Sequence, residues 1–110
     1  MIIDVKNDFS STPGPRYKEE GDFSGEVFRQ TILLPKIIKS IDEREKLIIK
    51  LDGTDGFGTS FLEESFGGLI REDHLKYEDI IDVLELISIE EPYLIEDINE
   101  YLKEAKIEAV

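Results

Sequence analysis

Two adjacent hydroxyls, Thr59 and Ser60, stand where an apolar run gives way to a helical pattern. Residues 46–52, "KLIIKLD", predict a strand too apolar for an exposed edge, so we place it in the middle of a sheet. Residues 53–58 follow with three glycines, which permit left-handed backbone and close approach of another molecule. A helix N-terminus tolerates an added phosphate, because its N–H groups are free and its dipole end is positive. Ser60, and in second place Thr59, are therefore candidate phosphate acceptors.

The same residues have a purely structural interpretation. Ser60 with Glu63 fits a capping box, in which the serine begins the helix and contributes about 1 kcal/mol. The glycines then only turn the chain. The loop is not a phosphate-binding Walker loop, because "GTDGFGTS" has no lysine. Both interpretations place Ser60 at the start of a helix.

Four carboxylates lie near this loop: Asp52, Asp55, Glu63 and Glu64. Together they raise the question of a metal or an acid–base site. The cap accounts for Glu63 and the turn accounts for Asp55, while His74 is the only histidine in the chain. We therefore expect no metal site and no catalytic residue. A hydrolase or transferase built on these carboxylates is the alternative.

Two arginines upstream, Arg16 and Arg29, also have two interpretations. Near the Ser60 loop, a guanidinium could hold a phosphate or a carboxylate in a bidentate grip. Alternatively, each arginine forms an internal salt bridge to Glu63 or Glu64 that orders the long loop before residue 24. We favour the internal salt bridge.

The composition excludes several classes of function. The 110 residues carry a net charge of −13, and residues 72–110 alone hold 13 acids against 3 lysines, a net −10. Such a surface repels phosphate backbones, so we expect no nucleic-acid partner. The absence of cysteine excludes disulfides and thiol chemistry and fits a reducing compartment. No apolar run reaches the roughly 20 residues of a membrane helix and no signal peptide is evident, so we expect a soluble cytoplasmic protein without a membrane partner.

Apolar periodicity predicts strands that alternate with helices. Expected strands cover residues 1–6, 46–52 and 83–89, with a short extended piece at 16–18. Expected helices begin at Ser24, with a kink or restart at Pro35, at Ser60, and near Pro92, and residues 74–81 form a helical turn. This order predicts one α/β domain over residues 1–110, with a small mixed sheet of about four strands and helices packed against it.

Three short motifs carry a resemblance to a known family. They read "GPRY" at residues 14–17, "SGEVFR" at 24–29 and, the most specific, "SFLEESFGGL" at 60–69. Through them, residues 14–105 resemble the STAS domain, the sulphate-transporter and anti-sigma-factor-antagonist module. The resemblance is closest to a STAS-like family of unknown function.

The resemblance implies a phosphorylation switch at the loop. In anti-sigma-factor antagonists, a strand ending in aspartate leads to an Asp-Ser-Ser-Gly loop, whose serine is phosphorylated by a partner kinase. Asp52 matches the strand-end acid, and Thr59 with Ser60 matches the hydroxyl pair. Gly58 and Phe61 depart from the Asp and the Gly that flank the hydroxyls.

The resemblance further implies a non-enzymatic bacterial signalling module without a cofactor. Its partner would be a protein, such as a kinase-type anti-sigma factor or a sensor ATPase. An alternative is a sensor that binds a small ligand or a nucleotide at the same sheet edge. The expected contact residues are Arg16, Arg29, Asp52, Gly56, Phe57, Gly58, Glu63 and Glu64. The oligomeric state stays open.

Overall fold

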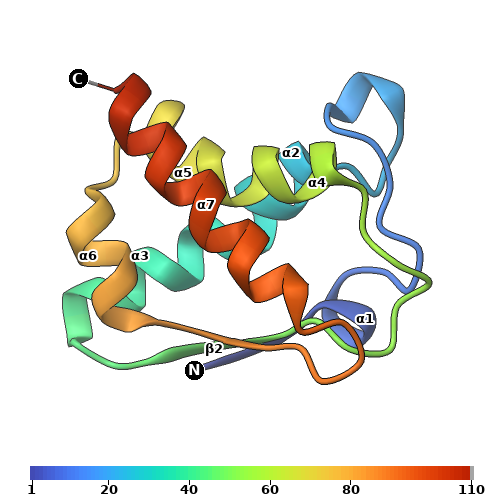
Figure 1. Ribbon diagram of the computed structural model, residues 1–110, viewed down its shortest axis with the longest axis horizontal. Coiled ribbons are helices and arrows are strands. Elements are labelled where there is room, and N and C mark those ends of the chain that lie inside the picture. The colour runs from blue at the N-terminus through green and yellow to red at the C-terminus, as the bar shows by residue number, and fades with distance from the viewer. Residues whose placement is uncertain (110) are drawn as a thin grey trace.

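The computed structural model describes residues 1–109, which fold around a sheet of three parallel strands (Figure 1). The strands are β1 (Ile2–Asp4), β2 (Leu47–Lys50) and β3 (Leu84–Ile87). β2 lies between the other two, so the prediction of a central strand at 46–52 is confirmed. The prediction of a mixed sheet of about four strands is corrected: both strand pairs are parallel, and residues 1–109 supply three strands.

The extended piece expected at residues 16–18 does not join the sheet. Its backbone bonds instead to the start of the next helix, where the Gly25 N–H donates to the Pro15 carbonyl at 2.9 Å and the Glu26 N–H donates to the Arg16 carbonyl at 3.0 Å. A 3₁₀ turn, η1 (Lys18–Glu20), follows directly. Because these backbone groups are already paired, they cannot extend a ladder.

Two helices within residues 1–109 contain a π turn, and we call them the first and the second long helix. The first long helix, residues 25–43, consists of α2 (Gly25–Phe28), η2 (Arg29–Leu33) and α3 (Leu34–Glu43). The second long helix, residues 59–71, consists of α4 (Thr59–Leu62), η3 (Glu63–Gly67) and α5 (Gly68–Arg71). The other helices are α1 (Val5–Asp8), α6 (Tyr77–Val83) and α7 (Tyr93–Glu108). Within residues 1–109, no helix has the length and the apolar character needed to cross a bilayer.

Ser24 and Pro35 shape the first long helix as the sequence predicts. The Ser24 hydroxyl caps the helix by accepting the Val27 N–H at 3.1 Å. Pro35 has no N–H to donate, and the helix widens into the π turn η2 just before it. There the Leu34 N–H donates to the Arg29 carbonyl, five residues back. The expected restart at Pro35 therefore takes the form of a π turn.

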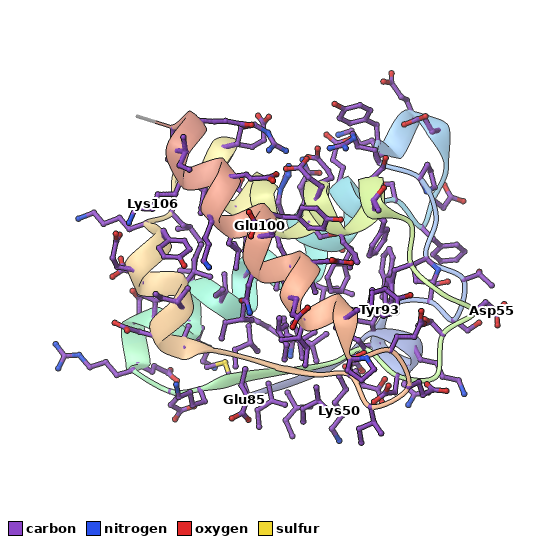
Figure 2. All side chains as sticks on the ribbon, in the orientation of Figure 1. Lys50, Asp55, Glu85, Tyr93, Glu100 and Lys106 are labelled. Carbon is purple, nitrogen blue, oxygen red and sulfur yellow. The ribbon has the colours of Figure 1, made fainter. Side chains whose placement is uncertain are left out.

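The long helices, α6 and α7 all lie on one face of the sheet (Figure 1). Ile3 and Ile49 turn toward these helices and are fully buried. Lys50 and Glu85 project from the opposite face (Figure 2), where Ile2 is also exposed. The strand order β1-β2-β3 explains this arrangement, because two right-handed crossovers that advance in one direction place their helices on the same side.

Candidate functional site

The loop after β2 is anchored at its first residues. The half-buried Asp52 carboxylate accepts the backbone N–H groups of Ile89 at 2.9 Å and Glu90 at 2.8 Å, in the loop after β3. In return, the Glu90 carboxylate accepts the Gly53 N–H at 2.5 Å. The two loops at the carboxyl ends of β2 and β3 are thereby held together. The Asp52 oxygens are thus engaged by the protein's own backbone.

Glycine bends the loop at two positions. Gly53 has a φ of 91° and Gly56 a φ of 124°, both in the left-handed region that favours glycine. Between them, the Asp55 N–H donates to the Ser11 carbonyl at 2.8 Å, which ties the loop to the N-terminal segment. A side-chain carbon added at Gly56 would meet no atom within 4 Å. The loop tip is therefore fixed in position and open to another molecule.

Aromatic rings hold the far end of the loop. The half-buried Phe57 ring lies 5.8 Å, centre to centre, from Phe61, which lies 5.7 Å from the buried Phe28. Phe57 therefore packs on the aromatic core with part of its ring and leaves the rest exposed. Gly58, with φ −75° and ψ 150°, occupies the N-cap of the second long helix, and no side chain caps it.

Thr59 and Ser60 are exposed in the first turn of the second long helix. The structure corrects the predicted capping box: the helix begins at Thr59 with Gly58 at the N-cap, so Ser60 is the second helical residue. Glu63 does not reach back to the cap either, because its carboxylate binds two arginines. Both hydroxyls are thus left at the solvent-facing start of the helix.

Ser60 borders a shallow, open hollow. The far side of the hollow is the segment before the first long helix, including Arg16 and Tyr17, whose ring lies 5.9 Å from the guanidinium carbon. Glu19 and Glu20 complete its lining. One base, Arg16, and two acids, Glu19 and Glu20, thus share the lining of the hollow with Ser60.

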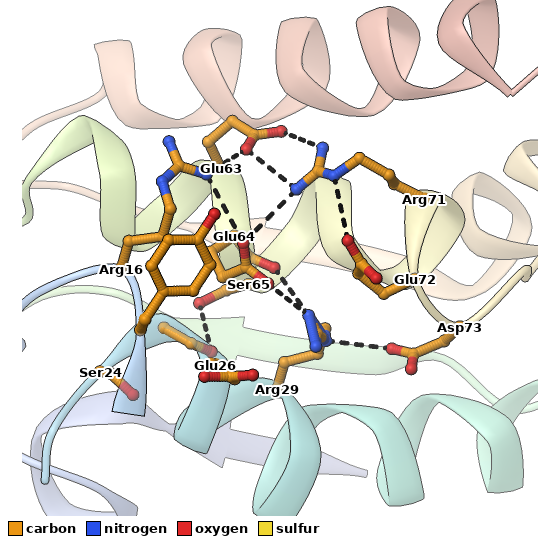
Figure 3. Close-up of polar contacts among 12 residues, drawn as sticks. Arg16, Ser24, Glu26, Arg29, Glu63, Glu64, Ser65, Arg71, Glu72 and Asp73 are labelled. Atoms are coloured by element: carbon orange, nitrogen blue, oxygen red, sulfur yellow. Dashed lines mark hydrogen bonds and ion pairs between the residues drawn. The ribbon is translucent and has the colours of Figure 1, made fainter. Parts of the chain in front are cut away.

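Six charged side chains join the two long helices and their flanking segments (Figure 3). They are Arg16, Arg29, Arg71, Glu63, Glu64 and Asp73, which we call the ion cluster. At its more exposed end, Arg16 donates to Glu63 at 2.5 Å, and Arg71 donates to both Glu63 oxygens at 2.7 and 3.1 Å. Glu63 therefore bridges the segment before the first helix to the end of the second.

The inner end of the ion cluster is almost fully buried. The Arg29 side chain is 3 % exposed, and its Nη1 donates to Glu64 Oε2 at 2.7 Å. Its Nε lies 3.1 Å from Asp73 Oδ2 as an ion pair that is not aligned for a hydrogen bond. The internal salt bridges favoured from the sequence, from Arg16 and Arg29 to Glu63 or Glu64, are confirmed by these contacts. Arg29 and Glu64 are thus interior residues in this structure.

Burial and ion pairing act in opposite directions on the carboxyl pKa values of the cluster. Desolvation works to raise the pKa of Glu63, but the hydrogen bonds from Arg71 and Arg16 outweigh it and leave this pKa lowered. For Glu64 and Asp73, desolvation is the largest influence, and their pKa values stay raised although Arg29 lies beside both.

Small residues let the two long helices approach closely enough to form the cluster. A side-chain carbon on Gly25 would lie 2.5 Å from the Phe61 carbonyl oxygen, so only glycine fits there. The buried Ser65 hydroxyl donates to the same carbonyl at 2.8 Å. Gly68 leaves the space that the Arg29 guanidinium fills. The motifs "SGEVFR" and "SFLEESFGGL" are therefore the two sides of one helix contact.

The four carboxylates considered for a metal or an acid–base site do not converge. Asp52 faces the loop after β3 and Asp55 is exposed near the loop tip, whereas Glu63 and Glu64 belong to the ion cluster. In the part of the chain that the structure describes, no three His, Asp or Glu side chains are grouped as metal ligands. His74 is exposed.

Sequence reasoning missed Arg71 and Asp73 as members of the ion cluster. Arg71 follows Glu63 by eight residues, about two helical turns, so a search for opposite charges at two-turn spacing would have found it. Asp73 lies beyond the helix end, where no helical spacing applies. Its position next to Arg29 depends on how the chain leaves the helix.

A family model for the STAS-like domain of unknown function (DUF4325) matches residues 24–94. The chain belongs to this family. The match includes both long helices, the glycine loop and β3. It leaves out the "GPRY" motif, so Arg16 enters the ion cluster from outside the matched part of this STAS-like domain. No curated protein matches the chain, and no solved structure does.

Proposed function

We propose that this STAS-like domain is a non-enzymatic regulatory module that binds a partner protein. Its docking surface would consist of loop 53–58 and the first turn of the second long helix. A phosphate on Ser60, or in second place on Thr59, would switch the binding off. The expected partner is a kinase-type ATPase of the anti-sigma-factor or sensor class, acting in the cytoplasm.

The observation that carries the proposal is the placement of the two hydroxyls. Thr59 and Ser60 are exposed, yet they stand on a helix whose remaining turns are fixed by the buried ion cluster. A kinase can therefore reach the hydroxyls, while the surface around them keeps one shape.

Arg16 supplies a physical route from phosphate to surface change. Ser60 precedes Glu63 by three residues, so the two side chains lie on one side of the helix. A phosphate of about −1.5 to −2 charges on Ser60 would repel Glu63 and compete with it for Arg16. Loss of the Arg16–Glu63 contact, now 2.5 Å, would loosen the segment that lines the hollow. The partner would then face both the added charge on Ser60 and a displaced segment around Arg16.

A small-ligand sensor has weaker support at the same place. The hollow beside Ser60 is shallow and open, and Glu19 and Glu20 in its lining repel an anionic ligand such as a nucleotide. We therefore put the interaction module first.

The switch is tested on tagged chains expressed in the source cells. Phosphopeptide mapping should find phosphate on Ser60 or Thr59 in at least one growth condition. Quantitative capture should show that Ser60→Asp retains about ten-fold less of one partner than Ser60→Ala does. Thr31→Asp adds the same charge at an exposed hydroxyl on the first long helix, outside the proposed docking surface, and should behave like the unmodified chain. Unphosphorylated hydroxyls together with equal capture by all three variants would remove the switch.

The docking surface is tested separately with the captured partner. Asp55 is exposed near the loop tip, and Asp42 is exposed on α3. Asp55→Lys should weaken partner binding by about ten-fold, whereas Asp42→Lys, with the same charge change, should leave it unaltered. Equal affinities for the two variants would place the interface elsewhere on the domain.

A further inference from the structure

The third strand, β3, has an unpaired edge. It bonds to β2 through Glu85 and Ile87, as the ladder register and the bond from the Leu51 N–H to the Ile87 carbonyl (2.9 Å) show. Because successive residues of a strand face opposite sides, Leu86 turns its own N–H and carbonyl away from β2. β3 is the last strand in the sheet order, so this edge has no neighbouring strand among residues 1–109.

An apolar hollow runs beside this edge. It has a volume of about 270 Å³ and lies between α6, β3 and α7. Its lining consists of Ile81, Leu84, Glu85, Leu86, Ile95 and Asn99. Ile81 is 43 % exposed although it is a large apolar residue. The hollow and the free backbone edge together form a surface of the kind that strand addition uses, in which main-chain bonds give affinity and pockets take alternate side chains.

The charge around the edge indicates which strand would fit. Glu85 lines the hollow and projects from the open face of β3, next to the free edge. Glu85 belongs to the C-terminal part of the chain, residues 72–110, which also supplies β3, α6 and α7 around the hollow and whose net charge is −10 from 13 acids and 3 lysines. Lys50 also projects from the open face, but it lies on β2, one strand further from the edge.

We propose that the free edge of β3 takes up an extended, basic segment of a partner protein as a fourth strand. Alternate side chains of this segment would be apolar and enter the hollow beside Leu84 and Leu86. The intervening side chains would be lysine or arginine and lie next to Glu85 on the open face. A second copy of this chain fits less well, because pairing two β3 edges would bring together two surfaces that are both strongly acidic.

This surface shares no residue with loop 53–58 or the Ser60 turn. The inference therefore goes beyond the proposed switch and does not depend on it. The domain would have two separate binding surfaces. One would bind the kinase-type partner at loop 53–58, and the other would bind a basic strand at the sheet edge.

The test uses the full chain and a labelled peptide of alternating valine and lysine. Backbone amide spectra should shift at residues 84–88 and around Ile81 and Ile95 on titration. Methylating the peptide nitrogens along one edge should abolish binding, because it removes the main-chain donors. Replacing its lysines by glutamates should abolish binding as well.

Matched variants separate strand addition from general charge attraction. Ile81→Lys should weaken peptide binding by about ten-fold. Ile38→Lys carries the same charge change at an α3 residue of similar exposure, 41 % against 43 %, and should change it by less than about two-fold. Spectra of both variants confirm that each is folded.

Four outcomes would overturn the proposal. They are undetectable binding of the lysine peptide, unchanged binding of the methylated peptide, equal weakening by the two lysine variants, and a dimer of the chain alone that pairs through residues 84–88. The last outcome would assign the edge to a second copy.

Discussion

Arg29 and Glu64 form an ion pair that is almost fully removed from solvent, at 3 % and 4 % side-chain exposure. Removing one partner of such a pair costs about 3–5 kcal/mol, because the other charge stays buried, whereas replacing both by apolar residues is often neutral. Stability alone therefore does not account for the pair. Its effect here is positional: it fixes the second long helix against the first and so determines where Ser60 stands.

The lowered pKa of Glu63 leads to a prediction about pH. Its ionised form stabilises the fold above the ordinary value of 4.5, and this stabilisation is lost as the pH falls through the lowered pKa. Glu63→Gln should therefore reduce the free energy of unfolding by about 2 kcal/mol at neutral pH, and the gap to the unmodified protein should close in acid. Urea unfolding of both proteins across the acid range measures this gap.

The quantity to follow is the difference in free energy of unfolding between Glu63→Gln and the unmodified protein at each pH. The raised pKa values of Glu64 and Asp73 act with the opposite sign, since their stabilisation is lost as the pH rises through the raised values. Both groups are present in each protein. Glu72→Gln, which removes an exposed ion pair to Arg71, should cost at most about 1 kcal/mol at neutral pH. A Glu63→Gln gap that stays constant in acid would contradict the prediction.

At single positions, the sequence predicted salt bridges correctly but not the residue that caps the second long helix. The pairing of Arg16 and Arg29 with Glu63 and Glu64 could be predicted, because four charges in three short motifs need partners when the motifs pack together. The assignment of Ser60 as the cap was wrong. Serine is the stronger capping residue, but Gly58 occupies the N-cap and the helix begins at Thr59. Glu63 is bound to two arginines and does not complete a capping box.

The close contact between the two long helices predicts that an added side chain at Gly25 destabilises the domain. Alanine within a helix is ordinarily about 1 kcal/mol better than glycine. Gly25→Ala should reverse this sign and destabilise the domain by about 1–3 kcal/mol, because the added carbon would lie 2.5 Å from the Phe61 carbonyl oxygen. Thermal and urea unfolding measure the difference.

Gly58 provides the matched comparison. A side chain there meets no atom within 4 Å, and the backbone has ordinary N-cap angles. Gly58→Ser should therefore stabilise the domain by up to about 1 kcal/mol, through a new cap and a less flexible unfolded chain. If Gly25→Ala proved as stable as the unmodified protein, the close approach of the two helices would be wrong.

Elements could be predicted wherever the apolar pattern was long. The central strand, the first long helix with its break at Pro35, and the last helix all follow from spacing. The extended piece at 16–18 and the length of the first strand did not. β1 ends at Asp4 and a helical turn begins at Val5, whereas the predicted strand ran to residue 6. The prediction was too long because a short β-branched run does not distinguish a strand from a turn.

At the scale of the whole molecule, strand alternation with helices predicted the α/β layer, and the family match over residues 24–94 agrees with it. The sequence did not show that one face of the sheet is open. Residues such as Ile48 and Ile87 are apolar on that face, so the strands look as if they were buried on both sides. Only the strand order reveals that all the crossovers lie on one side.

The net charge of −13 predicts that added salt stabilises the domain. Most of this charge is on the surface, where like charges repel and destabilise the compact state. Salt screens exposed charges beyond about 10 Å at 0.1 M, whereas buried pairs such as Arg29–Glu64 are screened much less. Raising sodium chloride from low to moderate concentration should therefore raise the melting temperature by a few degrees, about what 1 kcal/mol produces in a domain of this size.

A less acidic variant shows whether repulsion is the cause. Glu100 and Glu104 are exposed on α7, and reversing each to lysine adds two charges, so the net −13 becomes −9. This double variant should melt higher at low salt and respond less to added salt, because less repulsion is left to screen. A melting temperature that falls with salt would mean that exposed pairs such as Lys106–Glu78 outweigh the repulsion. Repulsion on the acidic surface would then not destabilise the folded state, and the excess charge would act only on binding partners.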